Sequence, residues 1–209
     1  MKESIKKHSD IEKGLKEKLL KIEDIIKSNE KNAVKVKLIN EILGKLTDEF
    51  INIHHRSLTD QLTGFVNRWF LNEFLRKEMR LCRRYERDMV LALLDVDYLK
   101  QINDQFGHKA GDEALLKISD IIKENVRSAD VVARYGGDEF VIVFPVTRIK
   151  EARVVIERIK KAVVKKGKNR EYTLSISAGL AELTKKHKFA EDLVEDADKE
   201  LYKEKKKRK

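Results

Sequence analysis

The 209-residue sequence predicts an α/β domain built on a central sheet that contains antiparallel strands, preceded by an all-helical segment. Residues 1–57 lack proline and space their apolar residues as a helix does. Residues 89–94 form one uninterrupted apolar run, which is typical of a buried central strand. Two further β-branched and aromatic runs flank Gly136-Gly137, as in a β-hairpin. These three features define the expected architecture.

The segment 1–57 is expected to be a coiled coil or a helical hairpin. Its apolar residues recur at intervals of three and four in two series: Leu15, Leu19, Ile22, Ile26, and then Ile39, Leu43, Leu46, Phe50, Ile53. The polar residues 28–32 put the two series out of phase, so a hairpin and one long kinked helix are both compatible with the pattern. Either structure would dimerise the protein or transmit a signal to residues 58–209.

Residues 58–209 show the alternation of a compact α/β domain. Helices are expected over 67–87, 98–106, 110–126, 148–166 and 190–206, and strands over 89–94, 131–135, 140–144 and 172–177. From the central strand onward the order is βααββαβ, which predicts a ferredoxin-like sheet with helices on one face. The helix 67–87 is expected to pack beneath that sheet.

Composition narrows the class of protein. The single cysteine, Cys82, excludes disulfides and cysteine zinc sites within one chain. About half of the net charge of +10 lies in the lysine-rich segment 199–209, and the remainder is spread over mixed-sign helices that indicate solvated faces. Aromatic residues make up 7%, few for base stacking, so no specific nucleic-acid binding is expected. No apolar run is long enough for a signal peptide or a membrane span, which predicts a cytoplasmic protein.

Two acids, Asp138 and Glu139, directly follow the glycines of the hairpin. Because glycine has no Cβ, the pair is expected to allow a tight turn with positive φ. Carboxylate oxygens bind Mg²⁺, and bare backbone lets a bulky phosphorylated ligand approach. The competing interpretation is a surface hairpin with solvated acids.

A second acidic motif, Asp95-Val96-Asp97, ends the central strand. An unpaired carboxylate is costly in a core, so these acids suit a metal site at the sheet edge. If this strand pairs beside the hairpin, Asp95 and Asp138 converge, and two metal ions there would serve phosphoryl chemistry, as in the palm of nucleotide polymerases and cyclases. Either aspartate can instead cap the next helix; we assign Asp97 mainly to the cap and Asp95 mainly to metal.

Four segments in order resemble the motifs of the GGDEF family, the bacterial diguanylate cyclases. They are Asp60–Arg68, Asp95–Asp104, Phe106–Asp112, and Gly136–Phe140, the last being the name-giving sequence unchanged. The resemblance covers about residues 58–206. It implies a palm-type cyclase domain that condenses two GTP molecules into cyclic di-GMP and two pyrophosphates.

The resemblance also implies the reactive site. Asp95, Asp138 and Glu139 correspond to catalytic, metal-binding carboxylates, with the Val96 carbonyl as a further ligand for two Mg²⁺ or Mn²⁺ ions per active site. Glu139 either binds metal or helps to deprotonate the ribose 3′-hydroxyl; a metal-lowered hydroxyl pKa would make a dedicated base unnecessary. Asn103 and Asp112 correspond to the guanine readers. An aspartate accepts hydrogen bonds from guanine N1–H and N2–H₂, so Asp112 favours GTP over ATP.

The remaining substrate contacts implied by the resemblance are Tyr98, Leu99, Lys100, Gly136, Gly137, Lys205 and Lys209. Lys100 and Lys205 would bind phosphates as mobile point charges. The family commonly continues with Gly-Arg-Asn after this lysine, whereas Lys206-Lys207-Arg208-Lys209 follow here. Lys209 stands where arginine is expected, which preserves the charge. His108 is interpreted as structural.

Arg127-Ser128-Ala129-Asp130 resembles the family's product-inhibition site, where cyclic di-GMP binds away from catalysis. Arginine grips a guanine edge or phosphate in bidentate fashion, and an aspartate reads the base. The alternative is that the arginine and the aspartate form a surface ion pair, which would contribute little to stability. Arg158 is a second contact of the kind that some family members use.

One domain offers one guanine site, whereas the product needs two nucleotides that attack each other. A homodimer held by the N-terminal helices, with two facing half-sites, meets that need. A cyclic di-GMP receptor without catalysis is the main alternative, but such a domain would have damaged acids, and Asp95, Asp138 and Glu139 all stand. The third interpretation, a basic coiled-coil scaffold, ranks last because it leaves the ordered motifs unexplained.

Overall fold

A computed structural model of the chain describes residues 17–27, 32–168 and 172–207. The chain divides into two compact units, Met1–Ser57 and Leu58–Lys209. Two residues named in the sequence analysis, Leu15 and Lys209, lie outside the described residues. No helix in the described ranges combines the length and the hydropathy that crossing a bilayer requires.

The first unit contains a helix over residues 17–27 and helix α2 (Asn32–Leu58). Lys35 Nζ donates a hydrogen bond of 2.8 Å to the Ile26 carbonyl, nine residues earlier. In one straight helix these residues would lie about 13 Å apart along the axis, so this contact favours the hairpin over the continuous helix. Large apolar side chains are exposed on both helices, among them Leu19 and Leu43.

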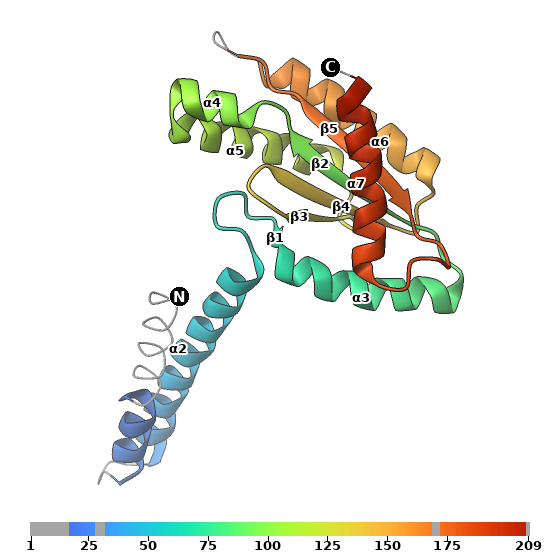
Figure 1. Ribbon diagram of the computed structural model, residues 1–209. Coiled ribbons are helices and arrows are strands. Elements are labelled where there is room, and N and C mark those ends of the chain that lie inside the picture. The colour runs from blue at the N-terminus through green and yellow to red at the C-terminus, as the bar shows by residue number, and fades with distance from the viewer. Residues whose placement is uncertain (1–16, 28–31, 169–171, 208–209) are drawn as a thin grey trace. The chain divides into compact units, whose positions relative to one another are not determined.

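The second unit is built on one five-stranded sheet with the order β1-β3-β4-β2-β5 (Figure 1). The strands are β1 (Val66–Asn67), β2 (Met89–Val96), β3 (Val131–Arg134), β4 (Glu139–Pro145) and β5 (Ile176–Glu182). The helices are α3 (Arg68–Tyr85), α4 (Leu99–Phe106), α5 (His108–Asn125), α6 (Ile149–Lys166) and α7 (Ala190–Lys207). β1 pairs with β3 in parallel, and all other neighbours are antiparallel. The predicted order βααββαβ from β2 onward is confirmed.

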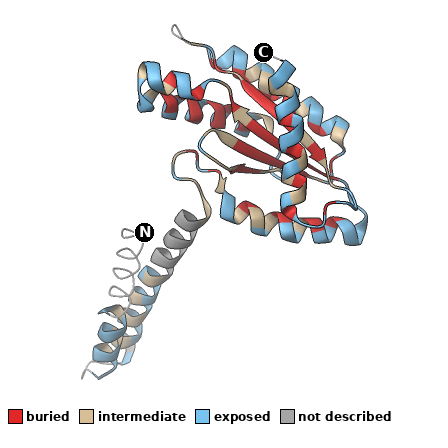
Figure 2. Ribbon diagram, in the orientation of Figure 1, coloured by how far each residue is buried: buried red, intermediate tan, exposed pale blue. Residues whose placement is uncertain are grey.

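Strand β2 lies inside the sheet, between β4 and β5, and both of its faces are apolar. Val90, Ala92 and Leu94 belong to the cluster that α4, α5 and α6 cover. Met89, Leu91 and Leu93 belong to a second cluster, formed with α3 and α7. Successive side chains of a strand point to opposite faces, so an unbroken apolar run needs cover on both. Figure 2 shows buried residues along the strands and the inward sides of these helices.

The prediction that helices cover one face, with only helix 67–87 beneath, is therefore wrong for α7. This helix lies with α3 on the second face, where Leu193 and Leu201 are buried. The last strand was also misplaced, since β5 covers Ile176–Glu182 rather than 172–177. The reason is close packing: a Cβ at Gly179 would lie 2.0 Å from the Ala197 carbonyl of α7. Glycine and alanine suit that contact but are poor strand signals.

The hairpin around the two glycines is confirmed, because β3 and β4 pair antiparallel from Val131–Val143 to Arg134–Phe140. The expected positive φ is wrong: in the described residues, glycines with positive φ are Gly64 and Gly107. Gly136 is needed for space instead, since a Cβ there would lie 2.6 Å from Glu139 Oε2. A Cβ at Gly137 would meet no atom within 4 Å, so the backbone there is open to a ligand.

Candidate active site

The acids of the two motifs meet where β2 ends and β4 begins. Asp95 is paired with Glu139 across the two strands. Beside them the Val96 amide donates to the Asp138 carbonyl at 3.0 Å. The expected pairing of the central strand with the hairpin is thus confirmed, and it places three carboxylates at one end of the sheet.

Helix α7 adds a cation to this site. Lys205 Nζ lies 2.7 Å from Asp95 Oδ1, with the two side chains 40% and 14% exposed. Glu204, the preceding residue, accepts from Lys160 Nζ on α6 at 2.6 Å and from the Ala178 amide of β5 at 3.3 Å. These contacts hold the last turns of α7 against the sheet, so that Lys205 reaches Asp95.

Two of these carboxylates, Asp95 and Glu139, have raised pKa values, and burial is the main cause. Burial raises the pKa of Asp95, the Lys205 ammonium opposes that rise, and Asp138 and Asp97 add to it. Burial likewise raises the pKa of Glu139, and the charges of Asp138, Asp95 and Asp198 add to the shift. Like charges held together in a partly buried site favour a bound cation that neutralises them.

The donor chemistry of this site fits Mg²⁺ or Mn²⁺. Asp95, Asp138, Glu139 and the backbone of Val96 offer oxygen atoms, the ligands that these hard ions take. Among the described residues, no three His, Cys, Asp or Glu side chains are gathered closely enough to hold a metal ion alone. Mg²⁺ is usually bound by one or two carboxylates plus substrate phosphates, so a partial set of protein ligands suits it.

Asp97 does not cap a helix as expected. The N-cap of α4 is Tyr98, in the left-handed conformation and without a side-chain cap hydrogen bond. Asp97 instead accepts hydrogen bonds of 2.6 Å from Ser175 Oγ and from Ser177 Oγ. Both are short, charge-assisted hydrogen bonds from hydroxyls of the segment beside the end of β2. The alternation of serines with Leu174 and Ile176 was the sequence signal for this anchor.

The three residues after Asp97 lie in different environments. Tyr98 is 66% exposed, whereas Leu99 is 7% exposed and packs in the core. Lys100 is exposed on α4. The Leu99 side chain is therefore in the core, so a substrate contact at this residue would come from its backbone at the start of α4. Backbone amides at a helix start favour phosphate oxygens.

Asn103 and Asp112 are brought together by the contact between α4 and α5. A Cβ at Gly111 would lie 2.0 Å from Asn103 Oδ1, so the asparagine side chain lies directly against the glycine. Asp112 follows Gly111 and is exposed on the first turns of α5. Sequence reasoning missed Gly111, although a glycine inside a helix costs about 1 kcal/mol and needs a reason.

Arg134 is the second residue that sequence reasoning missed. Its Nη1 lies 3.2 Å from both Asp60 oxygens, and its Nη2 donates to the Gly137 carbonyl at 2.8 Å. Burial alone would raise the pKa of Asp60, but hydrogen bonds from Thr63 and Arg134 hold it below its ordinary value. Asp60 begins one of the family motifs and Arg134 lies in the expected strand 131–135, but no sequence spacing pairs them. This link fixes the glycine turn that carries Asp138.

The Arg127–Asp130 segment forms a turn. Asp130 Oδ2 accepts from the Arg127 amide at 2.8 Å, and the Asp130 amide donates to the Arg127 carbonyl at 3.0 Å. No side-chain ion pair joins the two within the described chain. Arg158 of α6 donates to the Asn125 side chain at 3.0 Å and to the Asn125 carbonyl at 2.6 Å. Arg158 thus lies at the end of α5, two residues before Arg127.

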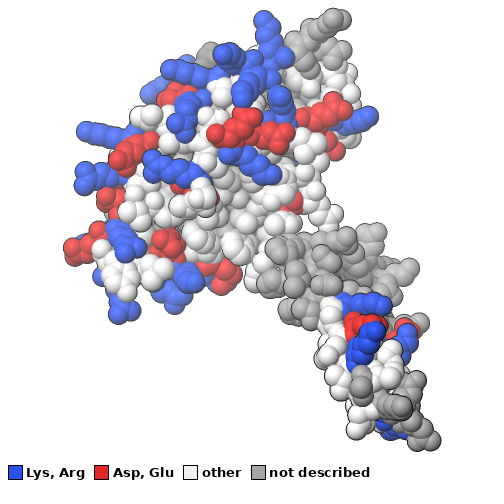
Figure 3. Space-filling view, turned by 180° about the vertical axis from the view of Figure 1, so that it is seen from behind, with Lys and Arg blue, Asp and Glu red and all other residues white. Residues whose placement is uncertain are grey.

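The surface charges are mixed. In Figure 3, lysine and arginine side chains of the second unit alternate with acids on the face shown. Exposed helical ion pairs such as Lys203–Glu200 on α7, at 2.6 Å, also mix the two signs of charge. Exposed pairs of this kind contribute little to stability. The mixed pattern agrees with the expected solvated faces.

Residues 57–209 match the family described as "Diguanylate cyclase, GGDEF domain". Diguanylate cyclase DgcP of Pseudomonas aeruginosa is 38% identical over 153 residues, which are 72% of this chain and 23% of that protein. The chain spans less than half of the length of the curated relatives it matches.

Two solved structures share the fold. Diguanylate cyclase SiaD of Pseudomonas aeruginosa, in complex with its activator SiaC, superimposes with a TM-score of 0.70 at 30% identity, covering 98% of this chain and 80% of that chain. The coiled coil and GGDEF domain of DgcB from Caulobacter crescentus gives a TM-score of 0.77, covering 84% and 95%. Its identity is 24%, so that likeness concerns the fold alone.

Proposed function

Because this chain belongs to the GGDEF family of diguanylate cyclases, we propose that it condenses two GTP molecules into cyclic di-GMP and two pyrophosphates. The observation that carries the proposal is the pairing of Asp95 with Glu139 at the strand ends, beside Asp138 and Lys205. Carboxylates and an ammonium group at one point of a sheet suit a triphosphate held through cations.

The reaction forms two phosphodiester bonds. The 3′-hydroxyl oxygen of each GTP attacks the α-phosphorus of the other, and the bond from that phosphorus to the bridging α,β-oxygen breaks. One pyrophosphate leaves for each bond formed, and the proton of each hydroxyl passes to Glu139 or to water. Two GTP molecules therefore give one cyclic di-GMP and two pyrophosphates.

Two Mg²⁺ or Mn²⁺ ions, held by the carboxylates of Asp95, Asp138 and Glu139 and the Val96 carbonyl, would stabilise phosphoryl charge and lower the pKa of the attacking hydroxyl. Lys205 neutralises Asp95 in the protein alone and binds the triphosphate when it enters. Lys100, the backbone at Tyr98 and Leu99, and Lys209 complete the phosphate contacts. Gly137 leaves room for the nucleotide, as the open space there supports, and Gly136 leaves room for the Glu139 side chain.

Asp112 and Asn103 select guanine. Asp112 accepts from N1–H and N2–H₂, and the Asn103 amide serves the acceptor edge of the base. Adenine lacks this donor pattern and would leave the Asp112 carboxylate without its partners in the complex, which disfavours ATP. The contact between Asn103 and Gly111 supports this assignment because it orients the amide beside Asp112.

The active form is a homodimer held by the N-terminal helices, with two half-sites facing each other. Exposed apolar side chains on the two described N-terminal helices, such as Ile26 and Val36, support a partner surface there. Cyclic di-GMP also inhibits the enzyme by binding to Arg127 and Asp130, with Arg158 as a second contact. The exposed Arg127 side chain near Arg158 supports this regulatory site.

The test is to incubate the purified chain with GTP and Mg²⁺ and to detect cyclic di-GMP by mass spectrometry. ATP and an Asp138→Ala variant run in parallel. Product from GTP alone, lost in the variant, establishes the cyclase. No product at high protein concentration, together with cyclic di-GMP binding that Arg127→Ala abolishes, identifies a receptor instead.

A further inference from the structure

Strand β5 forms one edge of the sheet, so one row of its backbone groups faces away from β2. The Leu183 amide donates to the Met89 carbonyl, and the Asp97 amide donates to the Ser175 carbonyl. The odd-numbered residues of β5 therefore direct their backbone N–H and C=O groups toward β2. Backbone groups alternate along an antiparallel strand. Ala178, Leu180 and Glu182 therefore turn their N–H and C=O groups outward.

This edge is closed at one end and open at the other. The Ala178 amide donates a hydrogen bond to the Glu204 carboxylate, which also accepts one from Lys160. Within the described residues, the N–H and C=O of Leu180 and the N–H of Glu182 have no hydrogen-bond partner in the protein. An open edge is a template for another strand, and proteins usually shorten or cover such edges. Here the bridge from α6 to α7 shortens the edge to the section beyond Ala178.

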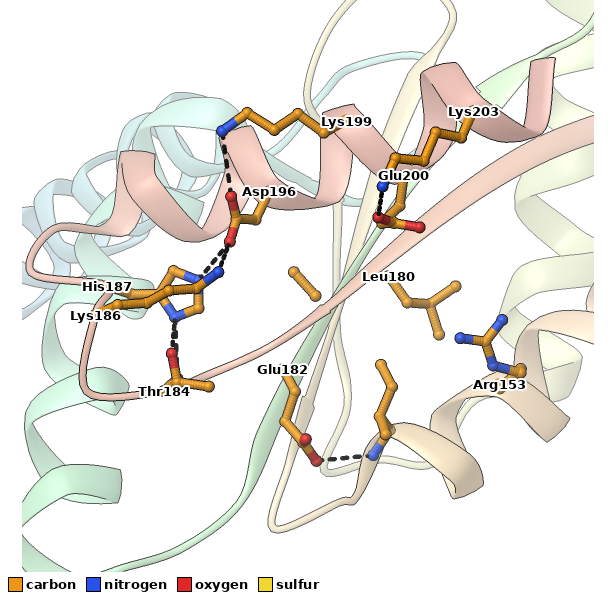
Figure 4. A pocket seen from close by; sticks show the side chains of 12 residues that line it. Arg153, Leu180, Glu182, Thr184, Lys186, His187, Asp196, Lys199, Glu200 and Lys203 are labelled. Atoms are coloured by element: carbon orange, nitrogen blue, oxygen red, sulfur yellow. Dashed lines mark hydrogen bonds and ion pairs between the residues drawn. The ribbon is translucent and has the colours of Figure 1, made fainter. Parts of the chain in front are cut away.

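A cavity of about 440 Å³ lies at the open section (Figure 4). Its lining includes Leu180 and Glu182, which point to the α6 side, and Ala181, which packs on the α7 side. Residues of both orientations line it, so the cavity faces the edge of the strand rather than one face of the sheet. Arg153 of α6 and Lys203 of α7 form opposite walls.

The charges around the cavity favour an acidic occupant. Lys203 is paired with Glu200 at 2.6 Å, and Lys199 is paired with Glu195 at 2.8 Å. Glu182 accepts from the Ile149 amide at 3.0 Å, so its charge is engaged at the start of α6. Arg153 is exposed, and in the described part of the chain its guanidinium has no hydrogen-bond or ion-pair partner. It points toward Leu180 in Figure 4.

We propose that the open edge of β5 at Leu180 is a docking site for an extended acidic segment of a partner protein. The segment adds to the sheet as a short further strand. Its backbone bonds to Leu180 N–H and C=O and to Glu182 N–H, and one acidic side chain pairs with Arg153. Main-chain hydrogen bonds give such strand addition its affinity, and side-chain contacts give its specificity. This inference does not depend on nucleotide chemistry.

The first arm of the test is hydrogen exchange of the free, ¹⁵N-labelled full chain, measured by NMR. Gly179 and Ala181 face β2, so their amides are expected to exchange slowly. The amides of Leu180 and Glu182 are expected to exchange much faster. A Leu180 amide protected as strongly as that of Ala181 would show that the edge is closed and overturn the proposal.

The second arm titrates two probes, acetyl-Thr-Val-Glu-Val-Thr-amide and the same peptide with lysine in place of glutamate. The acidic probe is expected to shift and protect the Leu180 and Glu182 amides, and Arg153→Gln is expected to weaken its binding about tenfold. Lys165→Gln, an exposed change on the same helix, serves as the control and should leave binding unchanged. Failure of the acidic probe to move these amides, or equal binding of both probes, would overturn the proposal.

Discussion

Arg134 and Asp60 are 74 residues apart in the sequence, yet Nη1 of the arginine lies 3.2 Å from both carboxylate oxygens. The same guanidinium donates to the Gly137 carbonyl, one residue before Asp138. One side chain thus ties the turn at the start of the second unit to the turn that carries Asp138, a proposed metal ligand. Because the guanidinium is planar with several donors in a fixed geometry, lysine cannot make both contacts at once.

Arg134→Lys is therefore expected to lower turnover of GTP about tenfold or more, because small displacements of reacting groups are costly. The lost hydrogen bonds should also reduce the free energy of unfolding by about 1–2 kcal/mol. Steady-state kinetics and urea unfolding measure the two effects. Arg76→Lys, which affects an exposed pair with Glu73, is the matched control. Unchanged kinetics in Arg134→Lys would show that the link is not needed for catalysis.

Glu139→Gln is expected to abolish turnover and to raise the thermal stability of the metal-free protein at pH 7. Burial and neighbouring acids raise the pKa of Glu139, so the folded state takes up the proton more readily than the unfolded chain. The ionised group thus costs stability above its folded pKa, and the cost disappears as pH falls toward its ordinary value of 4.5. Thermal unfolding from pH 7 to pH 4.5 should show the difference shrinking. A variant less stable than the parent at pH 7 contradicts this account.

Lys205→Ala is expected to destabilise the metal-free protein by about 1 kcal/mol, since it removes the partner of Asp95 while solvent screens part of the effect. Mg²⁺ should restore more stability to this variant than to the parent, because Asp95 is then free to bind the ion. The KM for GTP should rise as well. Thermal unfolding with and without Mg²⁺ measures the effect, with Lys203→Ala as the control on the same helix. Equal responses to Mg²⁺ would argue against Asp95 as a metal ligand.

Gly111→Ala tests the guanine site. The added Cβ would lie 2.0 Å from Asn103 Oδ1, so the asparagine must leave its position. The KM for GTP should rise about tenfold, with a smaller effect on kcat. Gly44→Ala is the control: it is a helical glycine with nothing within 4 Å of the added Cβ, and it should gain up to about 1 kcal/mol of stability. An unchanged KM would show that Asn103 does not read the base.

Arg127→Ala is expected to raise the concentration of cyclic di-GMP needed for half inhibition, with kcat unchanged. The arginine is exposed and precedes the end of β3 where Val131 pairs with Val143, whereas Asp95 pairs with Glu139 at the other end of β4. Arg158→Ala should weaken inhibition and also lower the melting temperature, since Arg158 holds the Asn125 carbonyl at the end of α5. Inhibition assays and thermal unfolding separate the two roles. Inhibition that persists in Arg127→Ala would place the regulatory site elsewhere.

The sequence predicted the parts of this fold that local pattern determines. The apolar run of β2 and the paired runs around Gly136-Gly137 are strong signals, and the expected pairing of the two segments is observed. Its register places Asp95 opposite Glu139, the residue after Asp138. The family motifs likewise located the acids. The predictions that were wrong concern features set by packing between segments that lie far apart in the sequence. The position of β5 was missed because Gly179 is selected for contact with α7, not for strand propensity.

Packing between distant segments also explains why the sequence did not predict some contacts of the site residues. Asp97 resembles a helix cap in one dimension, but two serines that lie about eighty residues later satisfy its carboxylate. In the sequence, nothing distinguishes Arg134 and Asp60 from other charged residues. Their contact depends on the pairing of β1 with β3. Such partners are set by strand order, which local spacing does not encode.

The placement of β2 also orders events in time. A ribosome releases β2 well before β4 and β5, its two neighbours in the sheet, and Lys205 emerges later still. During that interval an apolar strand with both edges unpaired is present in the nascent chain, where it is open to aggregation. The proposed active site is therefore complete only after α7 has been synthesised, and chains halted before α7 carry the acids without Lys205.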